Sequence, residues 1–114
     1  MNYCIFSGTI ASDLNLVSTA QGTSVLNFSI CESRRFKSGG KTKYENVYLK
    51  CEAWDSGAET ISKYFKRGDV IDIVARAKNK KNKEGWNETV FRVQEFSFPT
   101  RPYEPRSRTE NDGD

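Results

Sequence analysis

The chain has 114 residues, a formal net charge of +3, and a composition of 36% hydrophobic and 29% charged residues. This length accommodates one domain with its own core and is too short for two. The sequence has no apolar run near the roughly 18 residues that a membrane span needs. The start, Met1 to Cys4, also lacks the basic and apolar parts of a signal peptide. We therefore expect a cytoplasmic protein without a membrane partner.

Alternating apolar and polar residues predict five strands along the chain. The first covers 3–10, where Gly8 indicates a bend or bulge. A turn-rich stretch follows, within which 14–18 has the pattern of a short strand. The remaining strands are expected over 24–33, 44–54, 69–78 and 86–98.

The third predicted strand carries large aromatic residues on its outer face. Its inward set is Val47, Leu49, Cys51 and Ala53, and its outward set is Tyr44, Tyr48, Lys50 and Trp54. Exposed aromatic rings stack unpaired bases in proteins that bind single-stranded nucleic acid, where cations follow the phosphates. Exposed Tyr and Trp are also enriched in subunit interfaces. This strand alone leaves both interpretations open.

Cations gather in two predicted hairpin loops that flank the aromatic strands. The first loop, 34–41, contains Phe36 and has two glycines at its tip, and the second, 79–85, leads into Trp86. Acids instead concentrate in the last five residues. Such segregation of charge is expected of a protein that binds a polyanion, whereas one lysine-rich loop alone would need only solvation as its explanation. The candidate phosphate contacts are Arg34, Arg35, Lys37, Lys41, Lys43, Lys50, Arg76, Lys78, Lys80, Lys81 and Lys83.

One helix is expected between the third and fourth strands. Residues 56–59 match a capping box, in which Ser56 and Glu59 satisfy unpaired amides at the helix start. Ala58, Ile61 and Phe65 recur at helical spacing and form an apolar face. Gly68 supplies a stop signal after a cationic last turn. The helix therefore has a structural role.

Catalytic, metal and cofactor sites are not predicted. The chain has no histidine, the commonest general base and a frequent metal ligand. Its carboxylates are scattered or, like Glu45 and Glu52, lie among lysines, where solvation or ion pairing explains them. No glycine-rich segment has phosphate-loop spacing. Cys4, Cys31 and Cys51 fit neither a zinc pattern nor a disulfide framework, and we expect them to be small buried hydrophobic residues.

The order of these elements predicts an all-β oligonucleotide-binding (OB) fold. This fold is a five-stranded Greek-key barrel that binds single strands on the face of its second and third strands and with two flanking loops. The predicted aromatic strand and basic loops fall on these parts. We place the domain at 1–98 and a flexible tail with an acidic end at 99–114, where periodicity stops and prolines cluster.

The sequence also resembles the bacterial-type single-stranded DNA-binding proteins over residues 2–98. The matching motifs occur in order: Asn2, Ser7-Gly8-Thr9-Ile10, Asp13, Val25-Leu26-Asn27-Phe28-Ser29-Ile30, Trp54 before Ala58-Glu59, and Tyr64-Phe65-Lys66-Arg67-Gly68-Asp69-Val70. The resemblance implies an OB fold, sequence-tolerant binding of single-stranded DNA in replication, recombination and repair, and no catalysis. It also implies assembly as a homotetramer, with a dimer left open. The resemblance leaves a bacterial, an organellar and a phage origin open.

Residue by residue, the resemblance assigns base stacking to Phe36, Tyr48 and Trp54. The family often has a further aromatic near the position of Asn82, which is polar here, and Trp86 either compensates for it or packs beneath the hairpin. The tail ends in acids without the apolar tip that recruits partner proteins in the family, which argues against that route. The alternative functions are an RNA-binding or replication-restart OB module, an assembly module whose aromatics make subunit contacts, and a metal-dependent enzyme.

Overall fold

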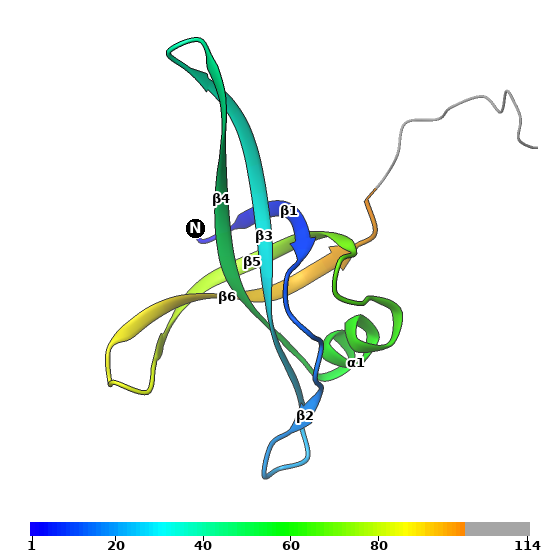
Figure 1. Cartoon of the computed structure of the whole chain (residues 1–114). Coiled ribbons are helices and arrows are strands. Elements are labelled where there is room, and N and C mark those ends of the chain that lie inside the picture. The colour runs from blue at the N-terminus through cyan, green and yellow to red at the C-terminus, as the bar shows by residue number, and fades with distance from the viewer. Residues whose placement is uncertain (100–114) are drawn as a thin grey trace, which may run out of the picture.

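The structure, a computed structural model, describes residues 1–99, so the expectations for the tail beyond residue 99 lie outside the described residues. Six strands and one helix follow each other along the chain (Figure 1). Their bounds are β1 (Cys4–Ile10), β2 (Val17–Ser18), β3 (Ser24–Ser38), β4 (Lys41–Trp54), α1 (Asp55–Tyr64), β5 (Val70–Lys81) and β6 (Asn87–Ser97). The described part of the chain contains no helix with the length and apolarity needed to cross a membrane.

The sheet closes on itself into a barrel. Its strand order is β1-β5-β6-β4-β3-β2, and an additional pairing of β1 with β3 completes the ring. Every pairing is antiparallel except that of β4 with β6, which is parallel and short. The short β2 only extends the edge of β3. The predicted five-stranded OB barrel, with a helix between its third and fourth long strands, is therefore confirmed.

Gly8 permits the closure of this barrel. A Cβ atom at this position would lie 2.8 Å from the carbonyl oxygen of Cys31 and would also clash with the Ile30 side chain. The pairing of β1 with β5 runs without interruption from Cys4 to Thr9. The glycine therefore marks a close approach of β1 to β3 and not a bulge.

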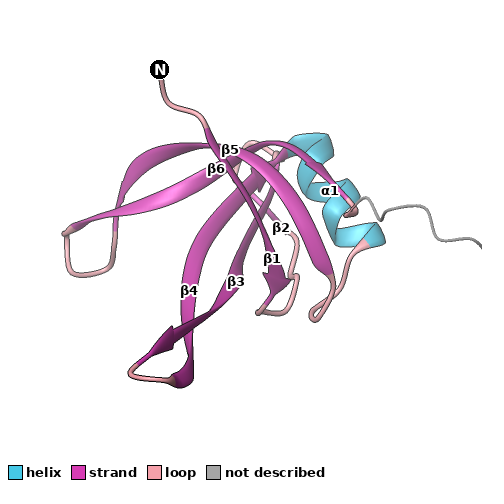
Figure 2. Ribbon diagram, turned by 90° about the horizontal axis from the view of Figure 1, so that it is seen from above, coloured by secondary structure: helices cyan, strands magenta, loops and turns pink. Residues whose placement is uncertain are grey.

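The core lies inside the barrel and beneath the helix, which covers one end of the barrel (Figure 2). The apolar face of α1 is buried there as predicted, through Ala58, Ile61 and the following Phe65. Alternate residues of the strands complete the core, among them Leu26, Phe28, Ile30, Ile71, Ile73 and Ala75.

The predicted capping box is wrong, because tertiary contacts determine the start of the helix. Within residues 1–99 no side chain caps α1, and Asp55 enters it with a φ of 55°. Glu59 instead accepts a hydrogen bond of 2.7 Å from Ser24 Oγ on β3. Gly68 also does not end the helix directly. It lies in the turn before β5, where its N–H donates to Ile10 O at 2.9 Å.

β3 and β4 extend far beyond the predicted strand ends. Residues predicted as a loop, 34–41, are mostly strand, and only Gly39 and Gly40 turn the chain, with φ values of 60° and 77°. The two strands form a ribbon that projects from the barrel (Figure 1). Of the predicted inward set, Cys51 and Ala53 are buried, Leu49 is half-buried, and Val47 is exposed because it lies where the ribbon leaves the core.

The three cysteines are free thiols, but only one of them is a core residue. Cys51 is buried, as predicted, whereas Cys4 and Cys31 are only half-buried. Both lie on strands whose outer surfaces meet solvent. Burial raises the pKa of the Cys51 thiol to about 12.

We predict that Cys51→Val preserves the fold and removes the part of the stability loss at alkaline pH that comes from ionisation of Cys51. Burial raises the pKa of Cys51 in the folded state, so the neutral thiol contributes its full stabilisation below about pH 8.5, the ordinary pKa of cysteine. That contribution to the free energy of unfolding is lost as the pH rises toward about 12. Valine has a similar volume, so the free energy of unfolding at pH 7 should change by less than about 1.5 kcal/mol. Urea titrations between neutral and alkaline pH measure both effects.

Cys4→Val, at a half-buried position, is the control for loss of a thiol. If the stability of the Cys51→Val variant falls with alkaline pH as steeply as that of the parent, Cys51 is not the group responsible.

Candidate nucleic-acid interface

Strand register places the predicted aromatic and basic residues of β4 on the outer face of the barrel. Tyr48 is opposite Cys31, Lys50 is opposite Ser29, and Trp54 is opposite Val25. Because side chains two residues apart share one face of a strand, Tyr48, Lys50 and Trp54 lie on one side of the sheet, as predicted.

An open groove crosses this face. It has a volume of about 340 Å³ and lies between the loop after β1, at Ser12 and Asp13, and the β5–β6 hairpin. A second hollow of about 440 Å³ continues along that hairpin and shares Lys50, Lys80 and Glu88 with the first. Because they share these three residues, the two hollows adjoin and form one open path. We call this path the groove.

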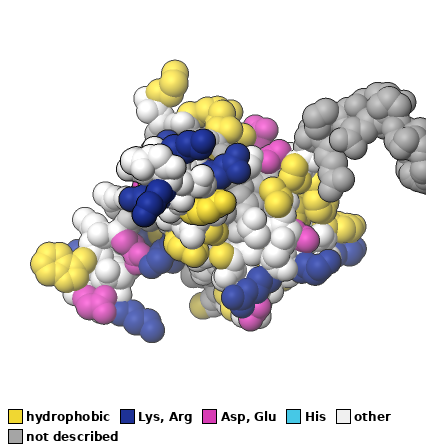
Figure 3. All heavy atoms as spheres, turned by 45° about the horizontal axis from the view of Figure 1, so that its top comes forward, with side chains coloured by type: hydrophobic (Ala, Val, Ile, Leu, Met, Phe, Trp, Pro, Cys, Tyr) yellow, Lys and Arg dark blue, Asp and Glu magenta, His cyan; other side chains and the backbone are white. Residues whose placement is uncertain are grey.

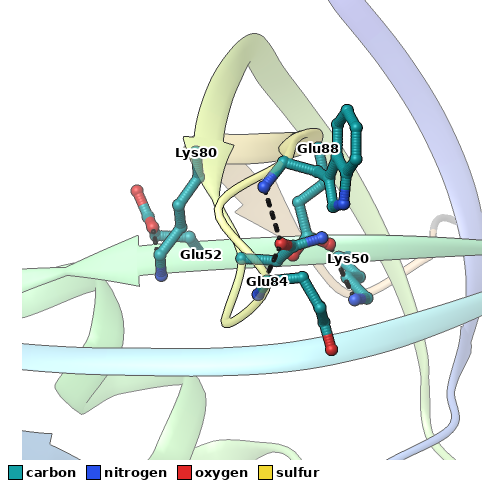
Figure 4. Close-up of polar contacts among 7 residues, drawn as sticks. Lys50, Glu52, Lys80, Glu84 and Glu88 are labelled. Carbon is teal, nitrogen blue, oxygen red and sulfur yellow. Dashed lines mark hydrogen bonds and ion pairs between the residues drawn. The ribbon is translucent and has the colours of Figure 1, made fainter.

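Two lysines that line the groove are already paired with carboxylates. Lys50 Nζ lies 2.7 Å from Glu88 Oε1, and Lys80 Nζ lies 3.5 Å from Glu52 Oε2 (Figure 4). Lys78 Nζ contacts the other oxygen of Glu52 at 3.2 Å. Ion pairing was one of the two explanations expected for Glu52, and it is confirmed. The other, solvation, is wrong, because the Glu52 side chain is only 3% exposed.

Glu52 remains an anion despite its burial. Burial by itself would raise the pKa of the carboxyl group, because it penalises the charged form. Three neighbours outweigh that effect: the Trp54 indole N–H, the hydrogen bond and charge of Lys78, and the charge of Lys80. The pKa of Glu52 therefore lies below its ordinary value. Within residues 1–99 Trp54 Nε1 has no hydrogen-bond partner of acceptable geometry, so we attribute the lowered pKa of Glu52 chiefly to the two lysines.

Trp54 is half-buried and has a neighbour that sequence reasoning missed. The Arg92 guanidinium carbon lies 4.9 Å from the centre of the Trp54 ring. Arg92 therefore occupies one face of the indole. The parallel pairing of β4 with β6 sets Arg92 beside Glu52 and so brings it near Trp54, two residues further along β4. Nothing in the local sequence pattern indicates that pairing.

Phe36 does not share a platform with Tyr48 and Trp54. It is opposite Lys43 in the ribbon, and strand alternation places it on the other face from Tyr48. Arg34 lies 5.9 Å from its ring and pairs with Glu45 at 3.8 Å. The face of Tyr48 instead continues to Tyr44, which is 70% exposed and which we had placed outward without assigning it a role.

The β5–β6 hairpin presents Trp86 to solvent. The side chain is 72% exposed, so the alternative in which it packs beneath the hairpin is wrong. Asn82, at the position where the family often has an aromatic, shapes the turn. Its Oδ1 accepts hydrogen bonds of 3.0 Å from the N–H groups of both Glu84 and Trp86.

The other predicted phosphate contacts lie on the ribbon and along β5 and its hairpin. Basic side chains gather on the projecting ribbon, whereas basic, acidic and apolar side chains are mixed at the β5–β6 hairpin (Figure 3). Within residues 1–99 these cations make no ion pair, in contrast to Arg34, Lys50, Lys78 and Lys80. The cations without an ion pair are Arg35, Lys37, Lys41, Lys43, Arg76, Lys81 and Lys83. In the same part of the chain, no three His, Cys, Asp or Glu residues are grouped as metal ligands.

The sequence is similar to those of proteins named single-stranded DNA-binding protein. A protein of that name from Enterococcus faecalis is 28% identical over 99% of this chain and 60% of its own length. Those from Mycobacterium leprae and Streptococcus pyogenes are each 28% identical, over 76% and 97% of this chain and 55% and 85% of their own lengths. The chain thus spans little more than half of some relatives.

The fold and the family follow from two further matches. A solved structure, the Plasmodium falciparum SSB complex with ssDNA, superimposes with a TM-score of 0.76 at 15% identity, covering 88% of this chain and 96% of the other. The family model described as the Single-strand binding protein family matches residues 1–97. Because this match includes every strand of the barrel, the chain belongs to the single-strand binding protein family.

Proposed function

We propose that this protein binds single-stranded DNA with little sequence preference and without catalysis, and protects exposed strands in replication, recombination and repair. The observation that carries the proposal is the groove, which is lined by Lys50, Lys80, Lys81 and Lys83. Tyr48 and Trp54 lie on the same face of β4 as Lys50. The names of the relatives support the same ligand.

The mechanism combines charge with stacking. Lysines and arginines along the groove and the ribbon neutralise phosphates and release the counterions condensed on DNA. Aromatic rings stack the unpaired bases, and stacking tolerates any sequence because every base has a π face. Duplex DNA keeps its bases paired and stacked inside, so it gains only the phosphate contacts.

We assign base stacking to Phe36, Tyr48, Trp54 and Trp86. Tyr48 and Trp54 share the barrel face, whereas Phe36 lies on the opposite face of the ribbon and Trp86 on the β5–β6 hairpin. A strand that uses all four must therefore bend around the ribbon. Phosphate contact is assigned to Arg34, Arg35, Lys37, Lys41, Lys43, Lys50, Arg76, Lys78, Lys80, Lys81 and Lys83.

We also infer that copies of the chain associate, as a tetramer or a dimer. Tyr3, Ile5 and Val70 are exposed, and none of them lines the groove. Apolar side chains outside the nucleic-acid site are suited to contacts between subunits. Light scattering on the intact protein measures the mass directly.

Single-stranded DNA should bind far more tightly than duplex of the same length, and the affinity should fall steeply with salt. Each phosphate contact on a single strand contributes about −0.7 to the slope of log K against log salt concentration. Fluorescence titration with oligo-dT and with a duplex, at two salt concentrations, tests this. Equal affinity for both at moderate salt would contradict it, and tighter binding of matched RNA would favour the RNA-binding alternative.

Trp54→Ala and Phe36→Ala should each weaken binding of oligo-dT by about 1 to 3 kcal/mol, the worth of one base stack. Tyr64→Ala is the matched control, because Tyr64 is 59% exposed on α1 and outside the groove. It should leave the affinity unchanged. If Trp54→Ala unfolds the protein or dissociates its oligomer while the affinity of each folded site is kept, Trp54 is a structural residue.

A further inference from the structure

Two carboxylates lie among the lysines of the groove, and they differ in burial. The Glu52 side chain is 3% exposed and contacts both Lys78 and Lys80, whereas that of Glu88 is 28% exposed and contacts Lys50. Lys50, Lys80 and Glu88 line the groove, and Glu52 does not line it but contacts Lys80, which does (Figure 4). A site built only for electrostatic attraction would contain neither acid, so each requires an explanation.

Glu52 cannot release its lysines when DNA arrives. If both ammonium groups turned to phosphates, a buried carboxylate would be left without a partner beside a polyanion, which is strongly unfavourable. Each ammonium group has three N–H donors, so Lys78 and Lys80 can keep Glu52 and still donate to phosphate. Glu52 is itself fixed by the backbone, since its strand pairs with β3 at Asn27 and with β6 at Arg92.

Glu88 is in the opposite situation. Its partner Lys50 is 65% exposed, and ion pairs near the surface contribute little to stability. A phosphate can take the place of the Glu88 carboxylate on Lys50, and the released carboxylate regains water. Glu88 and a phosphate therefore compete for Lys50, and the exchange leaves no buried charge without a partner.

We propose that Glu52 is a positioning residue that holds Lys78 and Lys80 toward DNA, whereas Glu88 competes with DNA for Lys50. The proposal rests on the proposed function of the groove. It predicts opposite effects from two chemically identical substitutions. Simple removal of negative charge would tighten binding in both cases, and simple structural damage would weaken it in both.

The test compares Glu52→Gln and Glu88→Gln by fluorescence titration with oligo-dT at two salt concentrations. Glu88→Gln should tighten binding about two- to fivefold, with a gain that shrinks as salt rises, because an exposed ion pair is lost. Glu52→Gln should weaken binding about three- to tenfold. Glu95→Gln is the matched control on the same strand as Glu88, since Glu95 is exposed, makes no ion pair within residues 1–99 and lies outside the groove.

A double-mutant cycle separates positioning from loss of fold. Lys78→Gln should cost affinity in the parent protein and cost less in the Glu52→Gln protein, because without Glu52 the ammonium group is no longer held in place. Circular dichroism reports the folded fraction. If Glu52→Gln does not fold, Glu52→Asp keeps the charge but shortens the reach, and an unchanged affinity in that variant overturns the role of Glu52.

The outcomes are distinct. If the parent protein does not bind oligo-dT, the proposed function itself is wrong. If the parent binds and both glutamine variants tighten binding, only net charge matters and Glu52 positions nothing. If Glu88→Gln weakens binding or leaves it unchanged, Glu88 does not compete with DNA. Equal costs of Lys78→Gln in both backgrounds also overturn the positioning role.

Discussion

The pairing of β3 with β4, from Val25–Trp54 to Ser38–Lys41, is the constraint on which the site depends. Inside the barrel, one face of this pair fills the core with residues such as Phe28 and Cys51, and the other face forms the groove. Where the pair leaves the barrel there is no core, so both faces of the ribbon meet solvent. Because side chains alternate between the two faces, Tyr48 lies on the outer face of the sheet, whereas Phe36 lies on the opposite face of the ribbon, which is also exposed there.

Burial of the Glu52 carboxylate is costly, and the ammonium groups of Lys78 and Lys80 beside it compensate that cost. Glu52 lies where the sheet is covered by Lys78, Lys80 and the Trp54 ring, and a carboxylate there is tolerated only because two ammonium groups face it. Replacing the three charged groups with apolar ones would remove the cost but also the cations that DNA would meet. The arrangement is therefore understood better through binding than through stability.

The barrel could be predicted from the sequence because strand alternation is a local property. The inward phase of Cys51 and Ala53 follows from it directly. What the sequence did not reveal depends on contacts between distant segments. Ser24 draws Glu59 away from the helix start, and the parallel pairing of β4 with β6 brings Arg92 over Trp54. The burial of Glu52 belongs to the same class, since its covering lysines come from another strand.

Ion pairing also reduces how much some basic residues would gain from contact with phosphate. Four of the eleven predicted phosphate contacts, Arg34, Lys50, Lys78 and Lys80, face carboxylates in the free protein. A phosphate must share or displace those acids, so the electrostatic gain per lysine is smaller than the sequence suggests. The proposed stacking contacts would not be screened by salt in this way. On the proposed function, stacking would therefore carry a larger share of the affinity as salt rises, and the protein would keep its preference for unpaired bases at salt concentrations where its attraction for phosphate is weakest.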